Sequence, residues 1–180
     1  MDMSGEYLIG IPRQQAWKSL LDPETLKNCI PGCESFDRVK KDHYRAKIKL
    51  VIGPVKASFN TELHITNAAP PKSYRLEGTS KAGAVGFGQG HADVILKEDT
   101  NGTILRYEAT FQVGGRLAQI GSRLIVGATR KIADEFFEKL TKHLDSRSKK
   151  TNEPPALKPR LTYIIGAFLL VIIALAYLTL

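Results

Sequence analysis

Apolar and polar side chains alternate with a period of two residues through most of the chain between Glu34 and Val113. This period is typical of β-strands that bury one face against a core. Turn signals separate the alternating segments, among them Gly53–Pro54, Pro70–Pro71 and Asn101–Gly102. The expected strands are Met3–Ile9, a segment beginning at Glu34, Tyr44–Leu50, Val55–Ile65, Tyr74–Gly78, Ala92–Leu96 and Thr103–Val113.

Two short helices and one long helix complete the predicted order of elements. Pro12 and Pro23 introduce the short helical segments 13–21 and 24–30, because proline fits the start of a helix. After the strands, apolar residues recur three and four positions apart, which predicts one helix from Arg116 to about Leu144. Its apolar stripe consists of Leu117, Ile120, Leu124, Ala128, Ile132, Phe136 and Leu140.

This order predicts an α+β fold for residues 1–145, in which a curved antiparallel sheet wraps around the long C-terminal helix. The inward strand positions include no Asp, Glu, His, Lys or Arg, so they offer no general acid–base pair. Two interpretations of this face stay open: an ordinary core, or the wall of an apolar ligand cavity with hydroxyls that bind a carbonyl group. The hydroxyl-bearing residues are Tyr44, Thr61, Tyr74, Thr103 and Tyr107.

The segment Leu161–Leu180 has the character of a transmembrane helix. It carries no charge, and twelve of its twenty residues are Leu, Ile, Val or Phe. Twenty helical residues rise about 30 Å, which matches the hydrocarbon thickness of a bilayer. Tyr163 and Tyr177 lie near its two ends, where aromatic rings prefer the headgroup interface. A buried core helix is disfavoured because the segment has no polar face.

Residues 146–160 form a predicted basic linker before this helix. They contain three prolines and five Lys or Arg residues against Glu153 as the single acidic residue. The positive-inside rule then places the domain in the cytoplasm, as a single-pass C-terminal tail anchor in the cytoplasmic membrane. The same cations are expected to contact anionic membrane lipid. The whole chain has a formal net charge of +8, much of it explained by this linker.

Other candidate chemistry is weaker. Cys29 and Cys33 have no further Cys or His pair at zinc spacing, so no metal is expected and the thiols are interpreted as packed and reduced. Arg116, Arg123 and Arg130 recur every seven residues and are expected on one helix face. That face is either merely solvated or a docking stripe for an acidic partner or lipid headgroups. No nucleic-acid-binding motif occurs, so nucleic acid is not an expected partner.

Four stretches give the domain a family resemblance: CIPGCES at 29–35, GPVKASF at 53–59, PPKSYRLEG at 70–78 and VGGRLAQIGSRLI at 113–125. In this order they resemble the carbon monoxide dehydrogenase G-subunit family, a branch of the START-related lipid-transfer superfamily with a helix-grip fold. The resemblance covers about residues 3–143. It implies a molybdenum-containing carbon monoxide dehydrogenase as partner and a cavity suited to an isoprenoid quinone.

Three functions follow as hypotheses. The first is a non-catalytic, membrane-anchored accessory protein that recruits the dehydrogenase and binds or delivers a quinone. A carrier of another apolar ligand is a variant of this first function. The second function is a structural adaptor whose cavity is filled by side chains. The third is an enzyme. An aromatase or cyclase of the same fold is disfavoured by the uncharged inner face. The ligand is expected between sheet and helix, at Phe59, Tyr107, Phe111, Leu117, Ile120 and Leu124.

Overall fold

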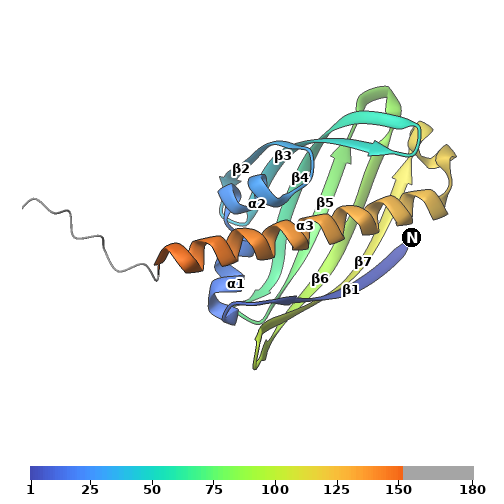
Figure 1. The fold of residues 1–180 in the computed structure, drawn as a ribbon. Helices are drawn as coiled ribbons and strands as arrows, with labels where there is room; N and C mark the ends of the chain where they lie inside the picture. The colour runs from blue at the N-terminus through green and yellow to red at the C-terminus, as the bar shows by residue number, and fades with distance from the viewer. Residues whose placement is uncertain (152–180) are drawn as a thin grey trace, which may run out of the picture. The chain divides into compact units, whose positions relative to one another are not determined.

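One antiparallel sheet curves around a long helix in the computed structural model, which describes residues 1–151 and the side chains of residues 1–144 (Figure 1). Met1–Ser146 form one compact unit. The sheet has seven strands in the order β1-β7-β6-β5-β4-β3-β2, and every neighbouring pair is antiparallel. The strands are β1 (Asp2–Ile9), β2 (Cys33–Lys40), β3 (His43–Ile52), β4 (Val55–Ala69), β5 (Ser73–Lys81), β6 (Phe87–Asp99) and β7 (Gly102–Gly114).

The predicted alternation is confirmed, because the members of one strand face are buried and their neighbours are exposed. Each of the five consecutive pairs from β2 to β7 is joined by a short connection, whereas β1 returns to pair with β7. The α+β fold, with its curved antiparallel sheet and C-terminal helix, is therefore the one expected from the sequence. The inward residues that are most fully enclosed include Tyr44, Ala46, Phe59, Leu96 and Leu105.

Two short helices, α1 (Arg13–Leu20) and α2 (Pro23–Cys29), connect β1 to β2. The side chain of Asp22 accepts a hydrogen bond from the Thr25 backbone N–H at 3.0 Å, which caps the first turn of α2. Apolar residues of α1 pack with Leu96 and Leu105 of the sheet and with Leu140 of the long helix. The largest core cluster therefore lies at the end of the molecule where α1 is found.

The single long helix expected from Arg116 is wrong at its start. Residues 115–120 instead form a short 3-10 helix, η2 (Gly115–Ile120), and the long helix α3 spans Ser122–Thr151. Gly121, with φ +91°, separates the two, because this left-handed backbone conformation ends the helical path at little cost only in glycine. A second 3-10 turn, η1 (Gly83–Val85), lies against η2, where Gly86 contacts Gly115.

Among the residues that the structure describes, no helix is both long enough and apolar enough to cross a membrane. The expected transmembrane helix at 161–180 lies outside the described residues, as does most of the expected linker. Both stay predictions of the sequence.

Candidate functional site

An apolar cavity of about 310 Å³ lies between the concave face of the sheet and the helices α1, α2 and α3. Its size is at the lower end of the range of small-molecule sites. None of the residues around it carries a charged side chain. The lining consists of Met3, Leu20, Leu21, Leu26, Ile30, Phe36, Tyr44, Leu63, Ile65, Tyr74, Leu76, Ala92, Val94, Leu105, Tyr107, Ala109, Thr129, Ala133, Phe136 and Phe137.

The cavity exists because small side chains face one another across the layers. On α3, Thr129 and Ala133 are one turn apart and share the face that looks at the sheet. Opposite them, the sheet offers Ala92 on β6 and Ala109 on β7, which are direct cross-strand neighbours. Large side chains at these positions would interdigitate and fill the layer, as they do elsewhere in the core.

The space continues along the sheet at two glycines, which have no side chain to fill it. Gly78 on β5 and Gly90 on β6 pair directly, and both occupy inward positions of their strands. An adjoining hollow of about 290 Å³ borders both glycines and shares Leu76, Ala92 and Thr129 with the main cavity. The main cavity lies beside α1, α2 and the middle of α3, and the adjoining hollow continues from it along β5, β6 and β7.

Three of the five inward hydroxyls are engaged in hydrogen bonds of the fold. The Thr103 hydroxyl donates to the Ile11 carbonyl at 2.7 Å, and Thr61 bonds to the Ser80 hydroxyl at 2.8 Å. The Tyr44 hydroxyl donates to the Leu21 carbonyl at 3.2 Å and accepts from Arg38 at 3.1 Å. These groups stabilise the domain and are not available to bind a carbonyl group.

The Tyr74 hydroxyl differs, because no described residue forms a hydrogen bond with it. The side chain is 8% exposed, lines the cavity and is held by an edge-on contact with Trp17 at 5.4 Å between ring centroids. Burial raises the pKa of Tyr74, with a further upward contribution from Tyr44, so the phenol remains a proton donor. Because Tyr74 lines the cavity, a ligand acceptor there would give this hydroxyl a hydrogen-bond partner.

Tyr107 supplies a second hydroxyl at the cavity wall, between β7 and α3. Its ring stacks with Tyr7 of β1, and Tyr7 in turn stacks on Phe137 with 3.9 Å between centroids. The Tyr7 hydroxyl donates to the Asp134 carboxylate at 2.6 Å. Burial is the main cause that raises the pKa of Tyr107. This aromatic stack closes the side of the cavity between the edge strand β1 and α3.

The cavity lies elsewhere than the sequence analysis predicts. Of the six expected ligand contacts, Tyr107 lines the main cavity and Phe111 borders only the adjoining hollow. Phe59, Leu117 and Ile120 pack with Phe111 in a separate apolar cluster, where they contact one another instead of a ligand space. Leu124 is 56% exposed and lines neither hollow. The physical reason is the break at Gly121, which changes the faces that Leu117 and Leu124 present.

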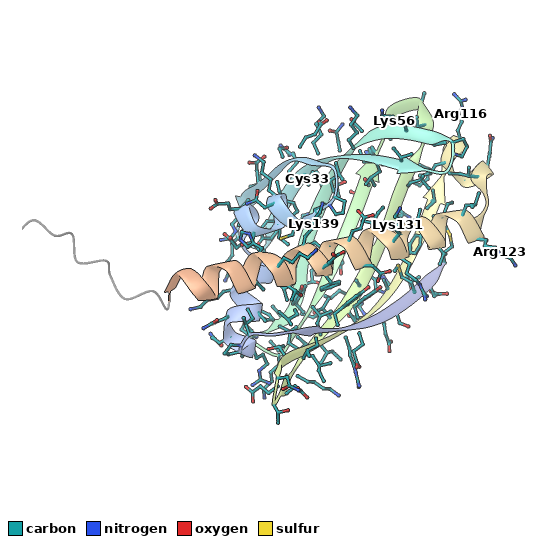
Figure 2. The ribbon with its side chains drawn as sticks, in the orientation of Figure 1. Cys33, Lys56, Arg116, Arg123, Lys131 and Lys139 are labelled. Carbon is teal, nitrogen blue, oxygen red and sulfur yellow. The ribbon has the colours of Figure 1, made fainter. Side chains whose placement is uncertain are left out.

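The three arginines expected on one helix face are all exposed, yet they do not form one stripe. Arg116 belongs to η2, whereas Arg123 and Arg130 belong to α3 beyond Gly121. Figure 2 accordingly shows Arg116 above the end of the sheet and Arg123 at the start of α3. Their role as docking residues stays a prediction.

The end of the molecule that carries Arg116 and Arg123 is basic and partly apolar. The β3–β4 turn, η1, η2 and the start of α3 meet there in one apolar cluster. Residues 47–58, 79–90 and 112–126 contain no Asp or Glu. The large apolar side chains Val51, Phe87 and Leu124 are 63%, 47% and 56% exposed. The basic residues of these segments are Lys47, Lys49, Lys56, Lys81, Arg116 and Arg123.

The two cysteines lie near each other in sequence but have separate surroundings. Cys29 is buried in the main core cluster, and burial raises the pKa of its thiol. Cys33 begins β2 and its thiol donates to the Ser35 carbonyl at 3.3 Å. Both are free thiols. Their surroundings fit packed, reduced cysteines.

Comparisons with known proteins agree with this architecture. The model of the carbon monoxide dehydrogenase G-subunit family (CoxG) matches residues 5–145. No relative is found among curated proteins. Among solved structures, a conserved protein from Geobacillus kaustophilus is 28% identical with a TM-score of 0.76, and the match covers 81% of this chain and 96% of that one.

Two further solved structures show the fold alone. TTHA0849 from Thermus thermophilus is 16% identical with a TM-score of 0.63, covering 82% of this chain and 99% of that chain. The Zhui aromatase/cyclase from Streptomyces sp. R1128 is 7% identical with a TM-score of 0.61, covering 84% and 98%. The same fold therefore occurs in a protein described as an enzyme, so fold alone does not decide the activity of this chain.

Proposed function

Because the chain belongs to the carbon monoxide dehydrogenase G-subunit (CoxG) family, we propose that it is a non-catalytic accessory protein that holds an isoprenoid quinone. In this proposal the protein also recruits a molybdenum-containing carbon monoxide dehydrogenase to the cytoplasmic membrane. The quinone would then accept the electrons of the reaction close to the enzyme that releases them.

The observation that carries this proposal is the uncharged cavity with a single unpartnered donor in its wall. A quinone ring is flat and apolar, and its polar atoms are two carbonyl oxygens that accept hydrogen bonds. The Tyr74 hydroxyl is protonated, lines the cavity and has no hydrogen-bond partner among the described residues, so it fits one carbonyl. A space of about 310 Å³ holds a ring and the first part of a prenyl chain, with the adjoining hollow available for more of that chain.

The chemistry of the lining supports a binding role over a catalytic one. General acid–base catalysis needs a carboxylate or histidine within reach of the substrate; the wall of the main cavity contains neither, and of such groups the adjoining hollow is bordered by His91 alone. A filled core, as a purely structural adaptor requires, is also disfavoured by the small residues that keep the layers apart. A carrier of another apolar ligand remains the alternative, since apolar walls discriminate weakly between apolar molecules.

Two features support attachment to a membrane. The first is the apolar segment 161–180, which the sequence predicts to span a bilayer. The second is the basic end around Arg116 and Arg123, where exposed apolar side chains lie among the cations of segments that contain no Asp or Glu, although Lys47 pairs with Glu34 of β2 at 2.8 Å. Such a surface favours anionic headgroups by about 1 kcal/mol per cation near the bilayer.

We expect the full-length protein, purified in mild detergent from its native host, to contain about one quinone per chain. The main cavity has room for one ring, so a single ligand is the expected stoichiometry. Organic extraction followed by mass spectrometry measures both identity and amount. If the extract contains no ligand and the protein does not take up added quinone, the result supports the structural adaptor. If a different lipid is bound, the result supports a carrier of another apolar ligand.

We expect Tyr74→Phe to weaken binding of a short-chain quinone about two- to tenfold, because one hydrogen bond contributes about 0.5–1.5 kcal/mol. The thermal stability of the apoprotein should not fall, since the hydroxyl has no partner to lose. Tyr44→Phe is the matched control: it removes a hydroxyl bonded to Leu21 and Arg38, so it should lower stability and leave affinity unchanged. Equal effects of both substitutions on affinity would contradict the assignment of Tyr74.

A further inference from the structure

Three polar side chains outside the cavity meet on the convex face of the sheet. They belong to the adjacent strands β3 and β4, whose ribbons lie side by side in Figure 1. His43 pairs directly with His64 across the two strands, and Glu62 lies two positions before His64 on β4. Because successive side chains of a strand alternate between faces, Glu62 and His64 point to the same side, away from the buried Thr61. The strand register therefore brings two imidazoles and one carboxylate together.

The three side chains are close enough together to share one ion. One candidate ligand atom from each residue lies within 4.8 Å of the other two. The imidazoles of His43 and His64 stack with 4.2 Å between their centroids and 16° between their planes. Nε2 of His43 is buried and has no hydrogen-bond partner among the described residues. A bound cation would satisfy this nitrogen, which the protein itself leaves unpaired.

We propose that His43, Glu62 and His64 bind one divalent transition-metal ion of the zinc class. Imidazole nitrogen suits zinc, copper, nickel and iron, whereas magnesium and calcium prefer sites made of oxygen ligands. Three protein ligands leave at least one coordination position for water or for a side chain of a partner. The site lies on the opposite face of the sheet from the cavity, so it does not depend on the proposed quinone binding.

Coordination requires the exposed His64 ring to turn out of its stack on His43, because two nearly parallel imidazoles do not direct their in-plane lone pairs at one ion. Ligand atoms around tetrahedral zinc are about 3.4 Å apart, given zinc–ligand distances of about 2.0–2.2 Å. Glu62 and His64 are exposed and free to approach His43 by that amount. Arg45 lies 3.4 Å from the Glu62 carboxylate, but both side chains are at least half exposed, and such pairs contribute little. Metal binding would displace this arginine.

The test is a calorimetric titration of the chelator-treated, full-length protein with Zn²⁺, and we expect one ion per chain. His64→Ala and Glu62→Gln should each lower the affinity at least about tenfold, because each removes a ligand. Arg45→Gln should raise affinity, since it removes a competing cation. His91→Ala is the matched control, as His91 lies on the same strand face two strands away from β4 and should leave binding unchanged.

A second measurement separates loss of the site from loss of the fold. Co²⁺ bound by two imidazoles and a carboxylate gives visible absorption bands, which should appear in the wild type and in His91→Ala and vanish in His64→Ala. Circular dichroism should be the same for all variants, because none of the substituted side chains is buried. Absence of Zn²⁺ binding to the wild type, or equal binding by His64→Ala, overturns the proposal.

Discussion

Ala133→Trp is expected to reduce bound quinone to a few per cent of the wild-type content while the domain still folds. Ala133 lines the cavity from the middle of α3, on the same face as Thr129 and Phe136. An indole at this position points into the space between the helix and the sheet, where Ala92 and Ala109 leave room for it. The ring thus occupies the volume that the ligand needs and introduces no buried charge. Ligand extraction and mass spectrometry measure the loss.

The control for this substitution is Leu124→Trp on the same helix. Leu124 is 56% exposed and borders neither hollow, so the same indole should leave ligand content unchanged. Thermal melting distinguishes the two functions. If residue 133 faced a closed core, a tryptophan would overpack it and lower stability by about 1–3 kcal/mol. An early-melting Ala133→Trp variant, together with a wild type that never binds ligand, would contradict the carrier function.

The sequence predicts most of the fold because apolar and polar residues alternate along each strand in the same way as buried and exposed positions do. Alternation alone identifies Tyr44, Phe59 and Leu105 as inward positions, and all three are buried. The start of the long helix is not predictable in the same way. Leu117 and Ile120 continue the helical spacing of α3 although they belong to η2, so their periodicity hides the break at Gly121. A glycine within a regular apolar stripe is compatible with either structure.

The position of the cavity depends on which residues of the sheet face which residues of α3. The sequence of a single strand or helix does not show these contacts. Ala133 and Ala92 are ordinary small residues in sequence, yet opposite each other they leave a space. The large residues Phe59 and Leu117 are predicted as ligand contacts because of their size. In the structure they pack against each other and leave no space for a ligand. Small inward residues on both layers, rather than large ones, are the signal that locates the site.

The histidine cluster is hard to predict from sequence for a different reason. His43 and His64 are far apart in sequence, and each alone resembles an isolated surface histidine. A signal is nevertheless present in the predicted turn at Gly53–Pro54. Positions equally distant from the centre of a hairpin turn pair with each other, and the observed register pairs His43 with His64 in this way. Applying the hairpin register to the polar face brings the two imidazoles together.

Removal of residues 161–180 is expected to move the protein from the membrane fraction to the soluble fraction. Each Leu, Ile, Val or Phe at mid-membrane favours insertion by about 0.3–0.6 kcal/mol, and twelve of the twenty removed residues are of these types. The domain should remain folded, because all elements of the compact unit precede the deletion. The Geobacillus protein, of which the match covers 96%, has been crystallised with this fold. Ultracentrifugation of cell extracts and thermal melting check both expectations.

The truncated protein also tests the basic end of the domain. If Lys56, Arg116 and Arg123 face the bilayer, the truncated protein should bind anionic vesicles at low ionic strength and dissociate as salt screens the charges. Arg116→Glu combined with Arg123→Glu should abolish that binding, whereas Lys139→Glu, further along α3, should not. Retention on membranes at high salt would show that neither the removed segment nor this basic surface is the principal attachment. If the truncated protein and all its variants fail to bind vesicles, membrane attachment depends on residues 161–180 alone.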